Sequence, residues 1–304
     1  MNVSLVGRRT AGLKAQAFVL MQRILPQHRL MALVGWIAEV RMPAVKNFLI
    51  RSFVRMYDVD TTEAKRAVPG DFVHFNDFFT RELAEGARPV DGSPVSIVSP
   101  VDGIMSAAGR IDGAALLQAK GIHYTLENLL ATDLADAARF ENGSFASMYL
   151  APFNYHRVHC PLAGRLTAAR YVPGHLYSVN QTTVESLPRL FTRNERLICH
   201  FRTEVGPMVL VFVGALNVGS VSTPWTGRIR TRKTGVVDDL DVRATGVPAG
   251  VDKGQMIGWF NMGSTVIVLM PPGTCRWREG LANGTPLRMG ESIGALVLND
   301  AAPE

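Results

Sequence analysis

Apolar residues between about residues 12 and 57 recur at the spacing of amphipathic helices. In the last of three such segments, one face is formed by Val45, Leu49, Phe53 and Met56. Lys and Arg occupy the other faces, and the two earlier segments end near Pro26 and Pro43. Because apolar positions three and four apart fall on one side of a helix, the pattern predicts three consecutive amphipathic helices.

A different pattern begins near Ser93, where short Val- and Ile-rich runs alternate with Asp-Gly, Pro-Gly and Gly-Ser turns. This pattern is typical of β-strands. Two stretches of 22 residues, Gly206–Gly227 and Gly254–Cys275, carry no charge. Gly, Ser, Thr and Pro interrupt both, so we expect buried strands joined by turns rather than membrane-spanning helices. Short helices are expected near residues 75–83 and 125–140. The predicted fold class is α+β, a mostly β core with an N-terminal helical layer.

Charge separates the same two regions. The chain has 304 residues, 19% of them charged, and a net charge of +6. Residues 1–57 hold nine Lys and Arg but one acid, so the remaining residues are slightly acidic. Basic amphipathic helices suit an anionic membrane surface, although a helical cap packed on the core would have the same pattern. The aromatic residues of this region follow the apolar rhythm, which argues against nucleic-acid binding. Three widely spaced cysteines and the absence of a secretory signal indicate a reducing compartment.

Three separate segments carry candidate catalytic groups: Asp102 in Ser-Pro-Val-Asp-Gly, His156 and His159 in Tyr-His-Arg-Val-His, and Ser264 in Met-Gly-Ser-Thr. Each has a structural alternative, because Asp-Gly and Gly-Ser are common turns and two histidines alone do not complete a zinc site. Together they supply a nucleophile, a base and a group that orients the base. A serine hydrolase that uses Ser264, His159 and Asp102 is therefore one hypothesis, although the Gly-x-Ser-x-Gly motif is absent.

The motifs, in their order along the chain, resemble those of the phosphatidylserine decarboxylases. Met-Gly-Ser-Thr is similar to the Leu-Gly-Ser-Thr self-cleavage motif of that family, and the Asp102 and His156/His159 segments match its Ser-Pro-Ala-Asp-Gly and Tyr-His-Arg-x-His. Further matching blocks are Phe78–Leu83, Arg88-Pro89, Tyr177–Asn180, Phe191–Arg196, Val213–Ala215, Val218–Ser220, Lys253-Gly254 and Gly258–Phe260. Met262 and Met256 depart from the family pattern, which commonly has Leu and an acidic residue there.

The resemblance implies a proenzyme that cleaves itself between Gly263 and Ser264 into a large chain, 1–263, and a small chain, 264–304, which stay associated. His159 would be the base for Ser264, with Asp102 holding its imidazole. Ser264 would become a pyruvoyl group that forms a Schiff base with phosphatidylserine and releases carbon dioxide and phosphatidylethanolamine. His156 would assist decarboxylation or reprotonation. The prosthetic group implied is this covalent pyruvoyl group, with no metal.

The resemblance also assigns the two regions. Residues 1–57 would dock the protein on an anionic membrane that contains phosphatidylserine, and residues 58–304 would form the catalytic domain. We expect a peripheral protein on the cytoplasmic face of the cell membrane, with no nucleic-acid partner and with homo-oligomerisation left open. One difficulty follows from the spacing of the histidines. Residues three apart on a strand face opposite ways, so one shared site for His156 and His159 needs a bend.

Overall fold

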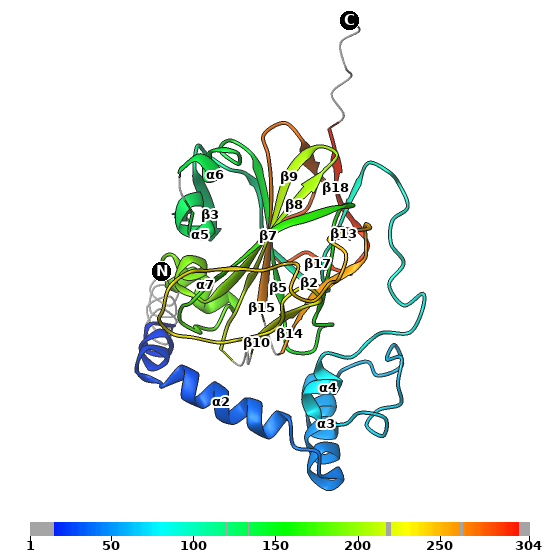
Figure 1. Ribbon diagram of the computed structural model, residues 1–304. Helices are drawn as coiled ribbons and strands as arrows, with labels where there is room; N and C mark the ends of the chain where they lie inside the picture. Colours follow the sequence, from blue (N-terminus) through cyan, green and yellow to red (C-terminus); the bar gives the residue numbers. More distant parts are fainter. Residues whose placement is uncertain (1–14, 120, 133, 217–219, 262–263, 298–304) are drawn as a thin grey trace, which may run out of the picture.

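A central antiparallel sheet organises the molecule, with the N-terminal helices lying below one end of it (Figure 1). The computed structural model describes residues 15–119, 121–132, 134–216, 220–261 and 264–297. The sheet contains, in spatial order, β12 (Asp238–Leu240), β7 (Gly164–Val172), β8 (Arg196–Thr203), β9 (Gly206–Val213), β15 (Ser264–Met270), β5 (Ser144–Leu150), β2 (Gly103–Arg110) and β17 (Pro286–Leu287). A further strand, β13 (Gly250–Val251), pairs with β7.

Smaller sheets and short helices surround this sheet. One small sheet has the order β11 (Gly227–Arg230), β10 (Ser220–Thr223), β14 (Met256–Phe260) and β6 (Arg157–His159). The others are β1 (Ser96–Val98) with β18 (Ser292–Leu296) and β16 (Cys275–Trp277), and the pair β3 (Ala115–Ala119) and β4 (Ile122–Thr125). The short helices of this part are α5 (Leu126–Leu130), α6 (Leu134–Ala138), α7 (Gln181–Ser186) and α8 (Leu190–Arg193).

Strand β15 lies in the middle of the large sheet, between β5 and β9, and all seven of its residues are buried. A strand covered on both faces needs apolar residues on both, which explains its continuous apolar run rather than an alternating pattern. The neighbouring β9 is buried over most of its length. The described residues of the two uncharged stretches therefore form strands and turns, as the sequence predicted.

The N-terminal region is helical, as predicted, in residues 15–24, α2 (Gln27–Ala38) and α3 (Pro43–Tyr57). Pro43 occupies the first turn of α3, where its missing N–H costs no hydrogen bond. In the part of the chain that the structure describes, no helix is both long and apolar enough to cross a membrane. With the β core, these helices confirm the α+β class.

Two short helices differ from their expected bounds. The helix expected near residues 75–83 is α4 (Phe75–Phe79), and Leu83 instead forms an extended bridge to Ala64. The segment expected at 125–140 is divided into α5 and α6, because Ala131 adopts a left-handed backbone with φ 47°. Local backbone geometry therefore shortened both elements.

The helical layer packs on the rest of the molecule through one face. Ile50 of α3 is buried in a cluster with Phe72, Phe75, Phe78 and Phe79. The opposite side is open to solvent, with Trp36 69% and Phe48 68% exposed. The cap and the exposed amphipathic surface that the sequence left as alternatives are thus two faces of the same helices. This aromatic cluster also spans both sides of residue 57.

Candidate active site

Ser264 is the first residue of β15 and pairs with Leu150 of β5. The residue is fully buried, and its hydroxyl Oγ has no hydrogen-bond partner among the described residues. Leaving a buried hydroxyl unpaired is costly, so such a group needs an explanation, and a catalytic role is one. The hydroxyls of Ser147, Thr265 and Tyr124 are also buried and unpartnered, so it is the Met-Gly-Ser-Thr motif that singles out Ser264. Gly263 and Met262 lie outside the described residues.

His159 lies at the end of β6 with both ring nitrogens engaged. Its Nδ1 is 2.8 Å from the carbonyl oxygen of Gly254, and its Nε2 is 3.0 Å from the hydroxyl of Tyr155. A carbonyl only accepts, so Nδ1 carries the proton and Nε2 presents its lone pair to Tyr155. Burial lowers the pKa of His159 below its usual value, so the ring is neutral near pH 7. A neutral imidazole in this tautomer is suited to accept a proton at Nε2.

Asp102 lies in the bend between β1 and β2, and its carboxylate is held by groups other than His159. Nε and Nη2 of Arg88 donate to it at 2.8 and 2.6 Å, and the backbone N–H of Met289 donates at 2.8 Å. The expected Asp102–His159 hydrogen bond is not among the described contacts. A bidentate Arg–carboxylate pair is stronger than a bond to a neutral imidazole, and Gly254 fixes the tautomer instead.

The Asp102 bend nevertheless lies against His159. The backbone N–H of His159 donates to the carbonyl oxygen of Pro100 at 2.8 Å. The negative charge of Asp102 also raises the pKa of His159, against the larger effect of burial. Asp102 therefore acts on His159 through its field rather than through a direct bond.

His156 occupies a different environment, just before β6. Its Nδ1 bonds the carbonyl oxygen of Asn154 at 2.8 Å, and its ring centroid is 4.1 Å from that of Phe79. Burial lowers the pKa of His156 to about 3, so the ring is neutral, and its Nε2 has no partner in the described structure. The two histidines are therefore not brought together by any contact that the structure describes.

The pairing of β6 with β14 shows which histidine lies nearer to the segment that leads to Ser264. The carbonyl oxygen of His156 accepts from the N–H of Phe260, at the end of β14 that leads to Ser264. His159 lies opposite Met256, at the other end of β14. By register, His156 is the histidine beside the approach to the Met-Gly-Ser-Thr motif, which spacing alone did not reveal.

Arg81 is a site residue that sequence reasoning did not single out, although it lies within the matching block Phe78–Leu83. It is 4% exposed, and its Nε and Nη1 have no partner in the described chain. Nη2 makes one long bond, 3.4 Å, to the carbonyl oxygen of Phe153. Its positive charge contributes to the low pKa of His156, so the two groups are close. A buried guanidinium with unused donors is prepared for an anion. The sequence feature that could have pointed to Arg81 is the presence of an Arg beside a Phe-rich run.

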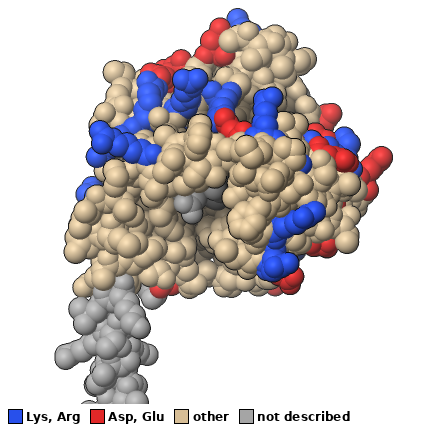
Figure 2. Space-filling model, turned by 90° about the horizontal axis from the view of Figure 1, so that it is seen from below, with Lys and Arg blue, Asp and Glu red and all other residues tan. Residues whose placement is uncertain are grey.

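A cavity of about 390 Å³ lies between the helical layer and this end of the sheet. Its lining is mainly aromatic and apolar, with a few polar groups, and consists of Phe53, Tyr57, Phe75, Phe79, Tyr149, Pro152, Ser178, Val179, Asn180, Ala215 and Leu216. The ring of Phe79 packs at a tilt against His156, and Tyr149 pairs with Thr265, the neighbour of Ser264. Below, the molecule presents a largely uncharged face that is hollowed near its middle, with Lys and Arg at its margins (Figure 2). We call the cavity of about 390 Å³ the aromatic chamber.

Metal ligands are not grouped in the described parts of the chain, where no three His, Cys, Asp or Glu side chains lie close enough to hold an ion. The candidate groups of the site are Ser264, the two histidines, Asp102 and Arg81; described interactions link His159 to the Asp102 bend and Arg81 to His156, but none links Ser264 to either histidine. They provide a nucleophilic hydroxyl, neutral bases and an unpaired cation.

Comparison with known proteins agrees with this set of groups. The phosphatidylserine decarboxylase family profile matches residues 75–295, and a second profile, described as PSD, matches residues 17–58. A protein of Azotobacter vinelandii named phosphatidylserine decarboxylase proenzyme is 47% identical over 93% of this chain and 99% of its own length. Proteins of the same name from Stutzerimonas stutzeri and Methylococcus capsulatus are 44% and 46% identical, over 96% and 94% of this chain and 98% of their own lengths. The chain therefore belongs to the phosphatidylserine decarboxylase family.

Proposed function

We propose that the protein converts phosphatidylserine to phosphatidylethanolamine and carbon dioxide, after cutting its own chain before Ser264. The family assignment supports the reaction. The observation that carries the site is the fully buried, unpartnered hydroxyl of Ser264 at the start of the central strand. The glycine before it leaves the carbonyl carbon of residue 263 unhindered for attack.

Self-cleavage begins when Oγ of Ser264 attacks the carbonyl carbon of Gly263. The C–N bond between residues 263 and 264 breaks, and an ester replaces the amide. The Cα proton of Ser264 and the carboxylate of Gly263 then leave by elimination, which ends the large chain at residue 263. The remaining dehydroalanine takes up water and releases ammonia, leaving a pyruvoyl group on residue 264.

His159 is the base in this proposal, as the family resemblance implies, and its neutral ring with the Nδ1 proton fixed by the carbonyl of Gly254 suits that role. The hydroxyl of Tyr155, bonded to Nε2, is a group through which a proton can reach the ring. When Nε2 gains the proton, the nearby negative charge of Asp102 stabilises the imidazolium. Asp102 is thus a positioning and charge-balancing residue rather than a direct hydrogen-bond partner.

The pyruvoyl group fits the site, because the hydroxyl from which it derives has no structural bond to lose and the next residue, Thr265, pairs with Tyr149 of the aromatic chamber. It supplies a ketone that condenses with the primary amine of the substrate and withdraws electrons as the carboxylate leaves. His156, neutral with an unpartnered Nε2, is placed to hold or return the proton at the substrate Cα. We assign Arg81 to the lipid phosphate rather than to the carboxylate, since pairing the carboxylate would stabilise the ground state against decarboxylation.

Strand pairing holds the two products of cleavage together. Ser264–Met270, which belong to the small chain, form β15 between β5 and β9 of the large chain. The N–H of Met289, also in the small chain, donates to Asp102 of the large chain. The cut therefore falls at the edge of a buried strand whose burial keeps the chains associated.

Membrane docking is the second part of the proposal. The exposed apolar face of α2 and α3 lies on the uncharged lower face that is hollowed near its middle (Figure 2). With the helices on the bilayer, the headgroup of a diacyl substrate could enter the protein while its acyl chains stay in the membrane. The net positive charge of residues 1–57 favours an anionic leaflet, which we take to be the cytoplasmic face of the cell membrane.

Intact-mass analysis of the purified protein, followed by an assay for carbon dioxide release from phosphatidylserine, tests the chemistry. We expect two chains, 1–263 and 264–304, with the smaller one lacking a free amino terminus. A single chain with an intact Ser264 would refute self-cleavage. Hydrolysis of ester substrates by that single chain would favour the alternative, a serine hydrolase that uses Ser264, His159 and Asp102.

A further inference from the structure

A basic pocket of about 240 Å³ lies at the beginning of α2 and shares no lining residue with the aromatic chamber. It is lined by Arg23, Leu25, Pro26, Gln27, His28, Arg29, His175 and Lys233. Five of these eight side chains are basic and none is acidic. Neither the motifs nor the proposed reaction uses this pocket.

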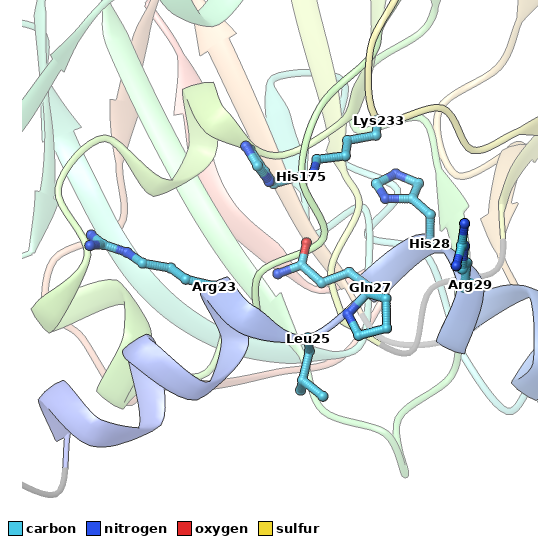
Figure 3. A pocket seen from close by; sticks show the side chains of 8 residues that line it. Arg23, Leu25, Gln27, His28, Arg29, His175 and Lys233 are labelled. Carbon is cyan, nitrogen blue, oxygen red and sulfur yellow. The ribbon is translucent and has the colours of Figure 1, made fainter.

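Three segments far apart in the sequence form the pocket. His28 comes from α2, His175 from the loop after β7, and Lys233 from the segment between β11 and β12. The side chains of these three residues lie around the same space, while Arg23 and Arg29 lie on either side (Figure 3). Chain folding, rather than one basic stretch, therefore gathers the positive charge.

Buried glutamines hold the walls of the pocket in place. The side chain of Gln27 accepts from the N–H of Leu176 at 2.9 Å and donates to the carbonyl oxygen of Gln22 at 2.8 Å. Gln22 in turn accepts from the N–H of Ser178 at 2.7 Å. These bonds tie the His175 loop to the helices on both sides, so the basic groups are held together before any ligand arrives.

The electrostatics of the pocket are unfavourable without an anion. Burial lowers the pKa of His28, and the charges of His175 and Lys233 lower it further, against a backbone contact with Gly174. Burial also lowers the pKa of His175, as do Lys233 and Arg193. Nε2 of His28 is buried and has no hydrogen-bond partner in the described structure. An oxyanion would offset the repulsion that the protonated rings would feel and would accept a hydrogen bond from the protonated Nε2 of His28.

We propose that this pocket binds the phosphate of an anionic phospholipid in the membrane on which the helices dock. The lipid source follows from position, because α2 runs from the pocket to the exposed Leu33, Trp36 and Ile37. A lipid phosphate held there would fix how the protein lies on the bilayer. The inference rests on the docking part of the proposed function but not on its chemistry.

The proposal makes binding dependent on pH. An anion in the pocket favours protonated His28 and His175, so binding takes up protons and tightens as the pH falls below about 7. The other charged groups around the two histidines are Lys233, Arg193, Arg23 and Arg29, which are all basic and add to the attraction for an anion.

A solution experiment on the processed full-length protein tests the phosphate chemistry. Histidine side-chain NMR signals are followed during titration with dihexanoyl phosphatidylglycerol below its micelle concentration, and separately with inorganic phosphate. We expect the lipid to shift His28 and His175, and phosphate to shift the same signals more weakly. An absence of shifts at both residues with either probe would overturn the site, and equal affinity for both probes would overturn a lipid source.

Vesicles test whether the site works at a membrane. His28→Gln with Lys233→Met is compared with a matched loss of charge, Arg202→Met, at the far end of β8. On phosphatidylglycerol vesicles we expect at least fivefold weaker binding for the double variant, since each basic group near an anionic surface contributes about that factor, and less than twofold for the control. Vesicles given the same surface charge by oleate should abolish the difference between the variants. Equal losses on both vesicle types would mean diffuse attraction and refute a phosphate site.

Activity separates this inference from the proposed function. Both variants should cleave themselves fully and decarboxylate detergent-solubilised phosphatidylserine at the wild-type rate, because neither substitution touches the aromatic chamber. Loss of vesicle binding with this activity intact supports the basic pocket. An inactive wild-type protein would instead refute the proposed reaction and leave the binding measurements valid.

Discussion

Strand β15 and the helices α2 and α3 use apolar residues in opposite ways. Every residue of β15 is buried between two neighbouring strands, and that packing holds the hydroxyl of Ser264 in one place. The helices bury only one face, in the Phe cluster, and leave Trp36, Phe48 and Met56 about 70% exposed. Burial in the sheet fixes the hydroxyl that we propose to react, whereas exposure on the helices leaves apolar surface for another apolar phase. Chemistry and membrane docking should therefore respond to different substitutions.

The largest effect is expected at Ser264. Ser264→Ala removes the only nucleophile of the proposed cut, so the protein should remain one chain by intact mass and release no carbon dioxide from phosphatidylserine. The matched control is Ser147→Ala in the adjacent β5, which removes another buried, unpartnered hydroxyl. That variant should fold, cleave and react normally. Cleavage of Ser264→Ala would contradict the assignment.

His159→Gln comes next. General-base catalysis typically contributes 10²–10⁴-fold, so self-cleavage of freshly synthesised precursor should slow by about 100-fold or more. In the wild type, the rate should stay constant from about pH 8 to 6.5 and fall at lower pH, because burial places the pKa of His159 below its usual value and the neutral ring is the base. Gel analysis of timed samples measures this. The exposed His123 offers a control, His123→Gln, which should cleave at the normal rate.

Arg81→Met should lower the activity without lowering the stability of the protein. Losing charge-assisted hydrogen bonds of about 1.5–3 kcal/mol should lower kcat/KM for phosphatidylserine by roughly 10- to 100-fold. Because Arg81 is a buried, largely unpaired charge, the melting temperature should stay constant or rise. Arg81→Lys keeps the charge and should recover part of the activity. A marked fall in stability would show instead that the guanidinium has a structural role.

The smallest effect concerns the helical layer. Trp36→Ala with Phe48→Ala should weaken binding to anionic vesicles roughly tenfold, since each side chain loses part of the 1.5–3 kcal/mol gained on full burial. Stability should change by no more than about 0.5 kcal/mol, because neither side chain packs on the core. Leu117→Ala, at an exposed position of β3, is the control. Point substitutions are preferable to removing residues 1–57, which would expose the Phe cluster.

Periodicity was enough to predict the broad architecture. The spacing of Val45, Leu49 and Phe53 predicted α3, and the uncharged Val- and Ile-rich runs predicted β9 and β15, because each kind of regular backbone repeats its side chains at a fixed interval. The ends of the short helices were less predictable. Ala131 interrupts a helical pattern by adopting a left-handed backbone, and Ala has no special preference for that conformation.

Local sequence also identified the candidate groups but not their partners. Ser264, His156, His159 and Asp102 stand out because their residue types lie in short, distinctive motifs. The sequence suggested that Asp102 would hold His159, yet Arg88 binds Asp102 and Gly254 binds His159. Which donor reaches which acceptor depends on segments that approach only after folding.

The sequence by itself determined the class of fold, the family, the buried strands and the basic character of the N-terminal helices, because these depend on residue type and spacing along one segment. The tertiary structure decided which side chains from distant segments became neighbours. It left Arg81 unpaired near His156, it placed His156 rather than His159 at the approach to Ser264, and it gathered His28, His175 and Lys233 in one pocket. Each of these arrangements joins residues tens to hundreds of positions apart, and their separation in space is set by packing rather than by any local pattern.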